Sequence, residues 1–380
     1  MKEHSIHDLI TPAALVDLDR VEHNISEMAT RAKEGGVSLR PHIKTHKCIE
    51  IGKMQLKAGA QGITVSTLAE AAVFADAGFD DITYAVPLSP DKFSGVQRIS
   101  EHTHLNVLVD HPAMVEQLSQ FCRNAKLSLD VLVKIYCGYP RTGIDPTTPE
   151  AISLVKKIYD DQNLSFKGIL THAGHSYDAK TVSEIKMVAL QEQEVMVRFA
   201  KVLNQENANL KPEVVSIGST PTARLADAFQ EGITEIRPGN YVFFDYTQVA
   251  LGTCNISDCA LTVLASVISV NPGRFVIDAG ATALSKDEGP IHIETNVGYG
   301  KLFADYQKSQ LNADVTLKAL SQEHGKLVPV DKAKLGYKHG DRVRIIPNHS
   351  CLTANLFDHY QIVKGESVVD RWRVHRGRYE

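Results

Sequence analysis

The sequence lacks several features that mark common protein classes. Among its 380 residues there is no run of 18 apolar residues, so no membrane-spanning helix is expected. The first residues, MKEHSIHDLITPAAL, have no charged start followed by an apolar core, so no signal peptide is expected. No G-x-G-x-x-G or G-x-x-x-x-G-K-[ST] segment occurs, so the two commonest nucleotide-binding motifs are absent.

Charge and cysteine content add two expectations. Lys and Arg number 41 against 45 Asp and Glu, a formal net charge of −4, so no basic surface indicates nucleic-acid binding. The six cysteines form no C-x-x-C pair and are Cys48, Cys122, Cys137, Cys254, Cys259 and Cys351. Without a secretion signal, this pattern predicts reduced thiols and a cytoplasmic location.

Short apolar runs alternate with amphipathic helical stretches through the first two-thirds of the chain. The runs are 39–44, 62–66, 82–86, 106–110, 130–136, 168–172, 214–219 and 235–239. Segment 66–78 is typical of the stretches between them, with apolar residues on one helical face and Gly78 at its end. A count of eight favours a (β/α)8 barrel of the α/β class over a doubly wound sheet, which is the alternative.

The texture changes after about residue 250. ALTVLASVISV, GRFVIDAG, DRVRIIPNHS and YQIVKG are strand-like, with little helix between them. TPAALVDLD (11–19) is also strand-like and precedes the first barrel run. We therefore predict a barrel over 20–250 and a mostly β domain formed by 1–19 and 251–380.

The segment RPHIKTHKC (40–48) concentrates cations at the end of the first run. In (β/α)8 barrels the working residues lie at the carboxyl ends of the strands, which is where Lys44 falls. Nearby cations lower the pKa of a lysine and favour its action as nucleophile and base. A solvated basic turn is the simpler alternative, but the strand alternation and the position favour a functional lysine.

Two loops at the seventh and eighth run ends predict a phosphate site. Barrels of this type commonly bind phosphate with the loops after strands seven and eight. The candidate residues in GSTPT and RPGNY are Gly218, Ser219, Thr220, Gly239, Asn240 and Tyr241. A lysine after strand one together with this site suits a Schiff base with pyridoxal phosphate (PLP).

Five segments carry a family resemblance that covers nearly the whole chain. RPHIKTHK, THAGHSYD, GSTPT, RPGNYVFFD and PNHSC resemble the D-serine dehydratase and D-threonine aldolase family. That family consists of PLP enzymes with the alanine racemase type of barrel (PLP fold type III) and a C-terminal β domain. The resemblance implies that Lys44 forms the Schiff base, that Arg141 contacts the cofactor phenolic oxygen, and that His172 lies against the ring. It also implies that Tyr177 binds the cofactor, that the two loops hold its phosphate, and that the protein is a homodimer.

His349 and Cys351 in PNHSC are candidate metal ligands. On a strand, residues two apart share a face, and imidazole with thiolate suits zinc. Two such residues are usually unrelated, but the resemblance implies a divalent metal here, with zinc favoured over manganese or cobalt. Incomplete protein ligation is what an open catalytic site requires.

The implied activity is that of a PLP- and metal-dependent lyase acting on D-3-hydroxy amino acids. D-Serine, D-threonine and D-threo-3-hydroxyaspartate fit the chemistry equally well. Dehydration to a 2-oxo acid and ammonia is favoured, because dehydratases of this family tend to have a cysteine where Cys351 stands and aldolases an aspartate. The following NLFD is more aldolase-like, so cleavage to glycine and an aldehyde stays open, as do an amino-acid racemase and a non-catalytic PLP carrier.

Overall fold

The computed structural model describes residues 4–330 and 335–378 and divides into two compact units. The barrel unit comprises Met28–Lys44, Gly52–Gly239 and the last residues from Gly377. The β unit comprises the residues up to Glu27, Thr45–Ile51 and Asn240–Arg376. Among the described helices, none combines the length and the apolarity needed to cross a bilayer.

Eight parallel strands form the barrel sheet, in the order β3-β10-β9-β8-β7-β6-β5-β4. They are β3 (Ser38–Leu39), β4 (Ile63–Val65), β5 (Asp81–Pro87), β6 (His104–Val109), β7 (Leu129–Lys134), β8 (Leu164–Leu170), β9 (Val214–Ile217) and β10 (Glu235–Ile236). A parallel bridge between His42 and Thr64 brings the chain after β3 beside β4. The predicted eight-stranded α/β barrel is confirmed.

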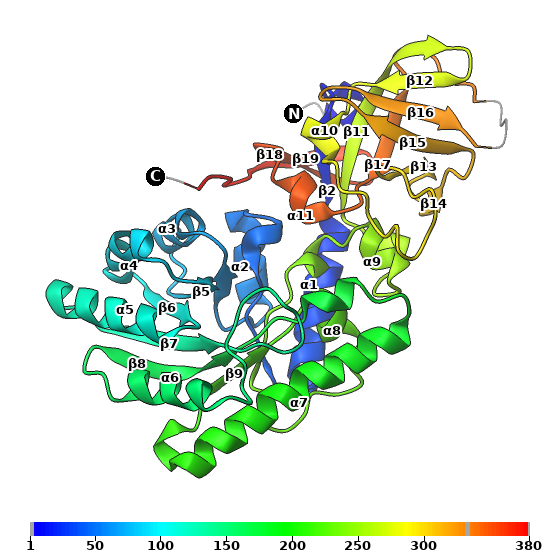
Figure 1. The fold of residues 1–380 in the computed structure, drawn as a ribbon. Coiled ribbons are helices and arrows are strands. Elements are labelled where there is room, and N and C mark those ends of the chain that lie inside the picture. Colours follow the sequence, from blue (N-terminus) through cyan, green and yellow to red (C-terminus); the bar gives the residue numbers. More distant parts are fainter. Residues whose placement is uncertain (1–3, 331–334, 379–380) are drawn as a thin grey trace. The chain divides into compact units, whose positions relative to one another are not determined.

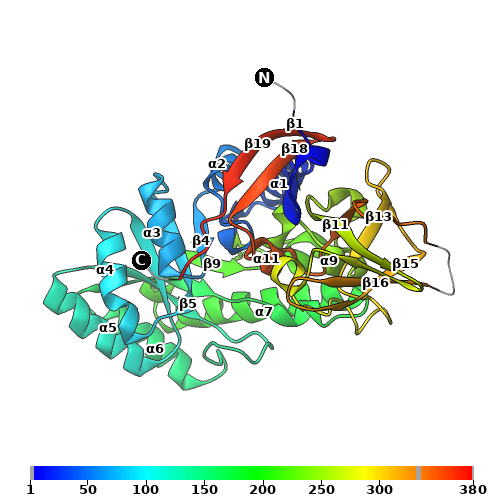
Figure 2. The ribbon, with the colours of Figure 1, turned by 90° about the horizontal axis from the view of Figure 1, so that it is seen from above.

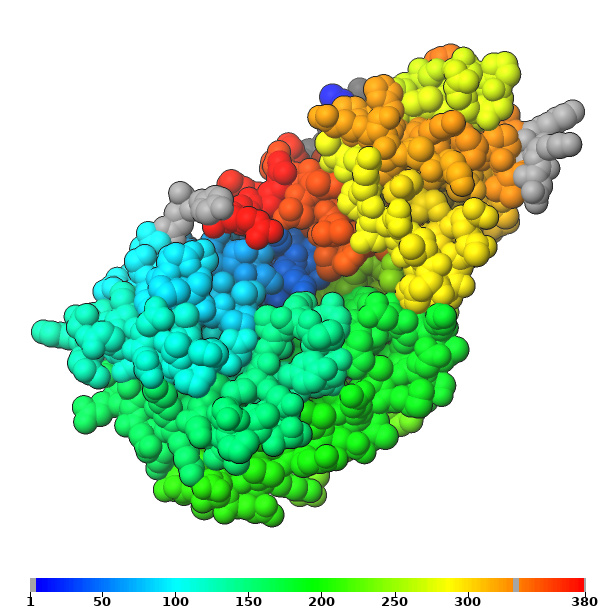
Figure 3. All heavy atoms as spheres, viewed as in Figure 1, coloured from blue at the N-terminus to red at the C-terminus, as the bar shows by residue number. Residues whose placement is uncertain are grey.

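Helices lie outside the barrel strands (Figure 1). Their bounds are α2 (Ile49–Lys57), α3 (Leu68–Asp76), α4 (Phe93–Ser100), α5 (Pro112–Ala125), α6 (Pro149–Tyr159), α7 (Val182–Glu206) and α8 (Thr220–Leu225). In α6, Ala151, Leu154, Val155 and Ile158 form one buried face, as the 3.6-residue period requires. Figure 3 shows the outer surface that the cyan-to-green residues of α4 to α7 give this unit.

The first and eighth strands are shorter than the runs 39–44 and 235–239 that predict them. Each ends before an Arg-Pro pair, at Arg40-Pro41 and Arg237-Pro238. Proline has no N–H to continue a strand ladder. The chain therefore leaves the sheet early and turns into the 3-10 helices η2 (Ile43–Thr45) and η6 (Asn240–Val242).

The β unit is built on an 11-stranded sheet (Figure 2). Its strands are β1 (His4–Ser5), β2 (Ala13–Asp17), β11 (Leu261–Asn271), β12 (Arg274–Ile277), β13 (Lys301–Asp305), β14 (Gln310–Leu311), β15 (Val315–Leu320), β16 (Gly325–Pro329), β17 (Arg342–Ile346), β18 (His359–Lys364) and β19 (Ser367–Arg373). Strand β2 pairs antiparallel with β11 and parallel with β18, so an N-terminal strand lies inside a mostly C-terminal sheet.

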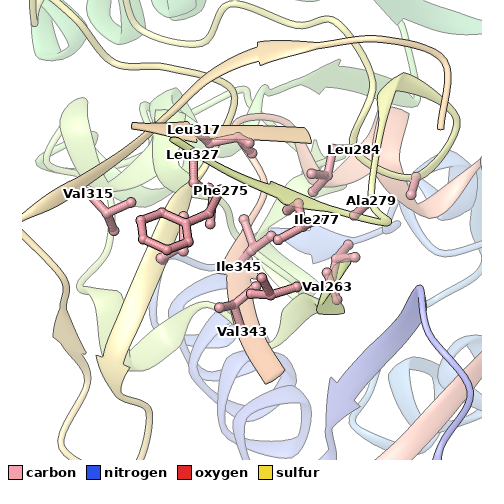
Figure 4. Packing of buried hydrophobic residues seen from close by; sticks show 14 of the residues in the cluster. Val263, Phe275, Ile277, Ala279, Leu284, Val315, Leu317, Leu327, Val343 and Ile345 are labelled. Carbon is pink, nitrogen blue, oxygen red and sulfur yellow. The ribbon is translucent and has the colours of Figure 1, made fainter. Parts of the chain in front are cut away.

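Apolar side chains of β11, β12, β15, β16 and β17 pack together in one core (Figure 4). Ile277, Leu317, Leu327 and Ile345 are fully buried in it. Short helices complete this unit: α9 (Tyr246–Ala250), α10 (Ala281–Leu284) and α11 (Ser350–Ala354). Helix α1 (Leu18–Glu34) has residues in both units.

Candidate active site

Lys44 lies in η2, just after the first barrel strand, and its side chain is half-buried. Its ammonium charge lowers the pKa values of two imidazoles, those of His42 and His172. Burial is the largest cause of both shifts, and the Lys44 charge is the second. Both pKa values fall well below the ordinary value of a histidine. Both side chains are therefore neutral at neutral pH.

Hydrogen bonds assign the tautomers of these neutral imidazoles. His172 Nδ1 lies 2.9 Å from the carbonyl oxygen of Gly218, which can only accept, so Nδ1 carries the proton. His42 Nδ1 accepts from the Lys44 backbone N–H at 3.4 Å, so its proton is on Nε2, 3.2 Å from Ser66 Oγ. His172 thus keeps Nε2 as an acceptor.

Arg40, the first cation of the basic segment, bonds to two carboxylates of the barrel unit and so has a structural role. Its Nε donates to Glu235 Oε2 at 2.6 Å and its Nη2 to Asp81 Oδ2 at 2.8 Å. Burial alone would lower the pKa of Arg40, but Glu235 and Asp81 raise it. This buried pair of bonds joins the chain after β3 to β10 and to β5.

Lys47 and Thr45, also in the basic segment, belong to the β unit and bond to other residues of that unit. Lys47 Nζ donates to Asn355 Oδ1 at 2.6 Å. Thr45 Oγ1 lies 3.2 Å from Cys351 Sγ. The cations of RPHIKTHKC are thus dispersed among separate partners and do not form one repulsive cluster.

The loop after β9 is held by a buried carboxylate. Glu192 of α7 is 0% exposed, and its Oε1 accepts from the backbone N–H groups of Gly218 at 3.0 Å and Ala173 at 3.1 Å. Its Oε2 accepts from Thr222 Oγ1 at 3.0 Å. The Ser219 backbone N–H donates to Thr222 Oγ1 at 3.1 Å, so two amides of GSTPT are already bonded within the protein.

An aromatic stack borders Arg141. The Tyr139 ring stacks on His175 with centroids 6.2 Å apart, and Arg141 Cζ lies 5.3 Å from the Tyr139 centroid. A Cβ on Gly174 would lie 2.4 Å from Tyr139 Cε1, so only glycine admits this ring. Tyr177 ends the 3-10 helix η4 (Gly174–Tyr177) that follows.

The barrel residues fit a phosphorylated, aldehyde-bearing cofactor. Lys44 supplies an amine, and Arg141 and Lys44 both contribute to the low pKa of His172, so these three groups are near one another. Gly218 has φ 119°, and a Cβ there would lie 3.0 Å from the Arg237 backbone nitrogen. The loops after β9 and β10 therefore approach as closely as backbone allows, which suits a backbone-lined anion site.

His349 and Cys351 do not lie on a strand, so the prediction that they share a strand face is wrong. Strand β17 ends at Ile346, and Pro347 cannot continue its ladder. His349 caps the N-terminus of α11 (Ser350–Ala354), and Cys351 lies in the first turn of that helix. Burial alone would lower the pKa of His349, but Asp287 and then Cys351 raise it well above its ordinary value, so the imidazole and the thiol lie near each other.

The pair has the donor chemistry of an open metal site. His349 Nδ1 lies 3.4 Å from Asp287 Oδ2, an arrangement that leaves Nε2 for a metal and fixes the ring. No group of three or more His, Cys, Asp and Glu side chains suited to metal binding occurs in residues 4–330 and 335–378. One imidazole and one thiol thus fit a divalent ion whose other positions are open to water or substrate.

The barrel has eight strands with a lysine after the first, and the β unit of the same chain holds an imidazole–thiol pair. These features define a class: PLP enzymes of the alanine racemase type. The family model for the alanine racemase N-terminal domain matches residues 16–247, and that for the serine dehydratase domain matches residues 260–363. The chain belongs to the D-serine dehydratase and D-threonine aldolase family, as its motifs predict.

Three curated relatives span nearly the whole chain. The D-threo-3-hydroxyaspartate dehydratase of Delftia sp. (strain HT23) is 37% identical over 97% of this chain and 98% of its own. The D-serine dehydratase of Dictyostelium discoideum is 36% identical over 96% of each chain. The D-threonine aldolase of Arthrobacter sp. is 28% identical over 96% of this chain and 92% of its own.

Solved structures of the Delftia enzyme are also similar to this chain. The enzyme gives a TM-score of 0.93 at 36% identity, over 99% of this chain and 100% of its own. Two mutant structures of D-threo-3-hydroxyaspartate dehydratase have the same TM-score of 0.93. One is a cysteine-to-alanine mutant in the metal-free form, and the other replaces by alanine a histidine two positions before that cysteine.

Sequence reasoning missed the carboxylates that support these groups. Glu192 had a usable signal: it lies three positions after Ala189 and four before Met196, on the buried face of α7. Asp245 ends the quoted motif RPGNYVFFD and is 1% exposed, but no local pattern separates it from an ordinary helix cap. Asp287 has no sequence signal, because its contact with His349 spans 62 positions.

Proposed function

We propose that this protein is a lyase that dehydrates a D-3-hydroxy amino acid to a 2-oxo acid and ammonia. The proposed reaction uses PLP and a divalent metal ion, for which zinc is favoured. The observation that carries this proposal is the pair of His349 and Cys351 at the start of α11, in a chain of the PLP barrel type. The relatives at 36–37% identity are dehydratases, whereas the D-threonine aldolase is 28% identical.

The family resemblance and the position of each residue support the following roles. Lys44 would bind the cofactor aldehyde and move the substrate α-proton, Arg141 would hold the phenolic oxygen, and His172 and Tyr177 would line the ring. Because the amides of Gly218 and Ser219 are bonded within the protein, we assign the phosphate contacts to other groups. These are the hydroxyls of Ser219 and Thr220 and the backbone of Gly239, Asn240 and Tyr241, with Gly218 shaping the loop.

Bound PLP withdraws electrons from the substrate α-carbon, and a bound divalent ion is a Lewis acid for the β-hydroxyl oxygen. His349 and Cys351 hold that ion and leave its remaining positions open. The His–x–Cys spacing agrees with the pair mutated in D-threo-3-hydroxyaspartate dehydratase. Within the β unit, the Thr45 hydroxyl lies 3.2 Å from Cys351 Sγ.

Product analysis tests the reaction. The purified protein is incubated with D-serine, D-threonine and D-threo-3-hydroxyaspartate, and the products are separated. A 2-oxo acid and ammonia in equal amounts support dehydration. Glycine and an aldehyde establish the aldolase alternative, which we consider because one of the relatives is a D-threonine aldolase. Equal turnover of L-serine would contradict the D preference, and interconversion of D- and L-alanine would establish a racemase.

Chelation tests the metal. We expect a strong chelator to abolish turnover while the cofactor absorbance and the folded state persist, and zinc, manganese or cobalt to restore it. Cys351→Ser should lose metal, whereas Cys254→Ser, a matched control on the other half-buried cysteine of the β unit, should keep it. Full activity of the chelated protein would contradict the assignment, as would a PLP-loaded protein inert to every D-amino acid.

The proposal also covers the domains, the partners and the location of the protein. We assign cofactor binding to a barrel over 20–250 and the metal site to a β domain of 1–19 and 251–380. The substrate is a small-molecule D-amino acid, and neither nucleic acid nor membrane is a partner. A cytoplasmic location and a homodimeric state are also proposed.

A further inference from the structure

Asp245 is a buried carboxylate whose two oxygens face different parts of the β unit. It caps α9 (Tyr246–Ala250), where its Oδ1 accepts from the Gln248 backbone N–H at 3.0 Å. Its Oδ2 accepts from the Ser350 backbone N–H at 2.9 Å and from Asn240 Nδ2 at 2.6 Å. One oxygen therefore serves the helix, and the other serves the Asn240 side chain five positions earlier and the Ser350 backbone 105 positions later.

The Ser350 amide is the backbone group between His349 and Cys351. The neighbouring residues of α9 hold the segment before it. The Tyr246 N–H donates to the Pro347 carbonyl at 3.1 Å, and Thr247 Oγ1 donates to the Asn348 carbonyl at 2.8 Å. The first turn of α9 thus fixes residues 347–350, a segment that contains His349 and immediately precedes Cys351.

The Asn240 amide connects the same carboxylate to the loop after β10. Asn240 Nδ2 lies 3.0 Å from Ser350 Oγ and 3.8 Å from Cys351 Sγ, in addition to its bond to Asp245. An amide nitrogen has two hydrogens, so the strongest acceptor, the carboxylate, sets its orientation. The backbone of Asn240 belongs to the loop that we assign to the cofactor phosphate.

We propose that Asp245 is a positioning residue: it holds His349 and Cys351 at the separation a metal ion requires, and it ties that pair to the phosphate loop through Asn240. This inference rests on the proposed function. Groups that orient the ligands of a metal site typically change metal affinity by about 10–100-fold when they are replaced. A carboxylate that only capped α9 would have no such effect.

The test is Asp245→Asn in the full-length, PLP-loaded protein. One amide oxygen cannot accept on both sides, so either the Ser350 amide or the Gln248 amide loses its acceptor. We expect zinc affinity, measured by competition with a fluorescent zinc chelator and by metal analysis after dialysis, to fall about 10–100-fold. Asp245→Ser keeps a side chain able to cap α9 but removes the link to Asn240 and should give the same loss.

A matched control separates positioning from capping. Asp258 caps the 3-10 helix η7 (Ile256–Asp258) by accepting from the Asn255 N–H at 2.7 Å. Asp258→Asn should keep the zinc affinity of the parent protein. Unchanged affinity in both Asp245 variants would overturn the inference, and so would failure of both to fold, since the carboxylate would then serve stability alone.

The outcome is separable from that of the proposed function. If the parent protein binds no zinc, or if His349→Ala leaves its zinc affinity intact, the metal assignment itself fails. If His349→Ala loses zinc and the Asp245 variants keep it, only the positioning role fails. The PLP absorbance of each variant reports in parallel whether the loss reaches the loop that contains Asn240.

Discussion

Replacing Glu192 with alanine should destabilise the barrel unit and weaken its hold on PLP. The substitution leaves the buried N–H groups of Gly218 and Ala173 without an acceptor. Each unsatisfied buried donor costs about 1–3 kcal/mol, so the two together lower the free energy of unfolding by about 2–6 kcal/mol. The Thr222 hydroxyl adds little, because it also lies 3.0 Å from Ser219 Oγ and can rotate toward it.

Glutamine at position 192 distinguishes the lost acceptor from the lost charge. Its amide oxygen can still accept from Gly218 and Ala173, and its NH2 can donate to the Thr222 hydroxyl. We therefore expect Glu192→Gln to lower the free energy of unfolding by about 1 kcal/mol or less. The matched control is Glu194→Ala, an exposed carboxylate on the same helix, which should be neutral.

Urea unfolding followed by circular dichroism gives the free energies, and PLP dissociation is measured by dialysis. The order of stability should be parent, Glu194→Ala, Glu192→Gln and then Glu192→Ala, with the weakest PLP retention in the last. A loss below 1 kcal/mol in Glu192→Ala would refute the reasoning about unsatisfied amides. Equal losses in the alanine and glutamine variants would show that charge, and not the acceptor, is what the loop requires.

Three further substitutions test the barrel unit. Arg40→Met leaves the buried Glu235 carboxylate unpaired, so the free energy of unfolding should fall by about 3–5 kcal/mol in urea titrations, and a neutral result would contradict the role of this ion pair. Gly218→Ala places a Cβ 3.0 Å from the Arg237 backbone nitrogen at a residue with φ 119°. The free energy of unfolding should fall by about 1–3 kcal/mol, and PLP retention should weaken. Retention equal to that of the parent protein would argue against this loop as the phosphate site. Burial and then the Arg237 charge lower the pKa of Lys134 from 10.5 to about 7. Between these pH values the unfolded chain binds one more proton than the folded chain, so stability should rise with pH across this window. Lys134→Met should flatten this rise in the melting temperature, and an unchanged pH profile would refute the pKa shift.

Much of the fold was predictable because alternating hydrophobic patterns are local. Eight apolar runs marked the eight barrel strands, and Gly78, with φ 87°, follows the helix that it was expected to end. The prolines at 41 and 238 could have shortened the first and last runs, since proline interrupts a strand wherever it occurs. Lys44 was predicted from its position at the carboxyl end of a barrel strand and from the motif RPHIKTHK, and its role stays a prediction.

The proximity of His349 and Cys351 was predicted for a reason that is wrong. Their assignment as metal ligands stays a prediction, but a strand face does not bring the two residues together. They meet because Pro347 ends β17 and a short helix begins at Ser350. A pattern of two residues cannot distinguish a strand from the first turn of a helix, so the local geometry had to come from the structure.

The sequence by itself determined the strand and helix order and the class of barrel, and it supplied the candidate reactive side chains, since these depend on periodicity and residue chemistry along a continuous chain. Only the tertiary structure decided which carboxylates support them. Asp245 bonds to the Ser350 amide across 105 positions, and Glu192 bonds to the Gly218 amide across 26. A buried carboxylate is stable only where donors converge on it, and those donors are backbone N–H groups, which every residue except proline carries and which therefore leave no mark in the sequence.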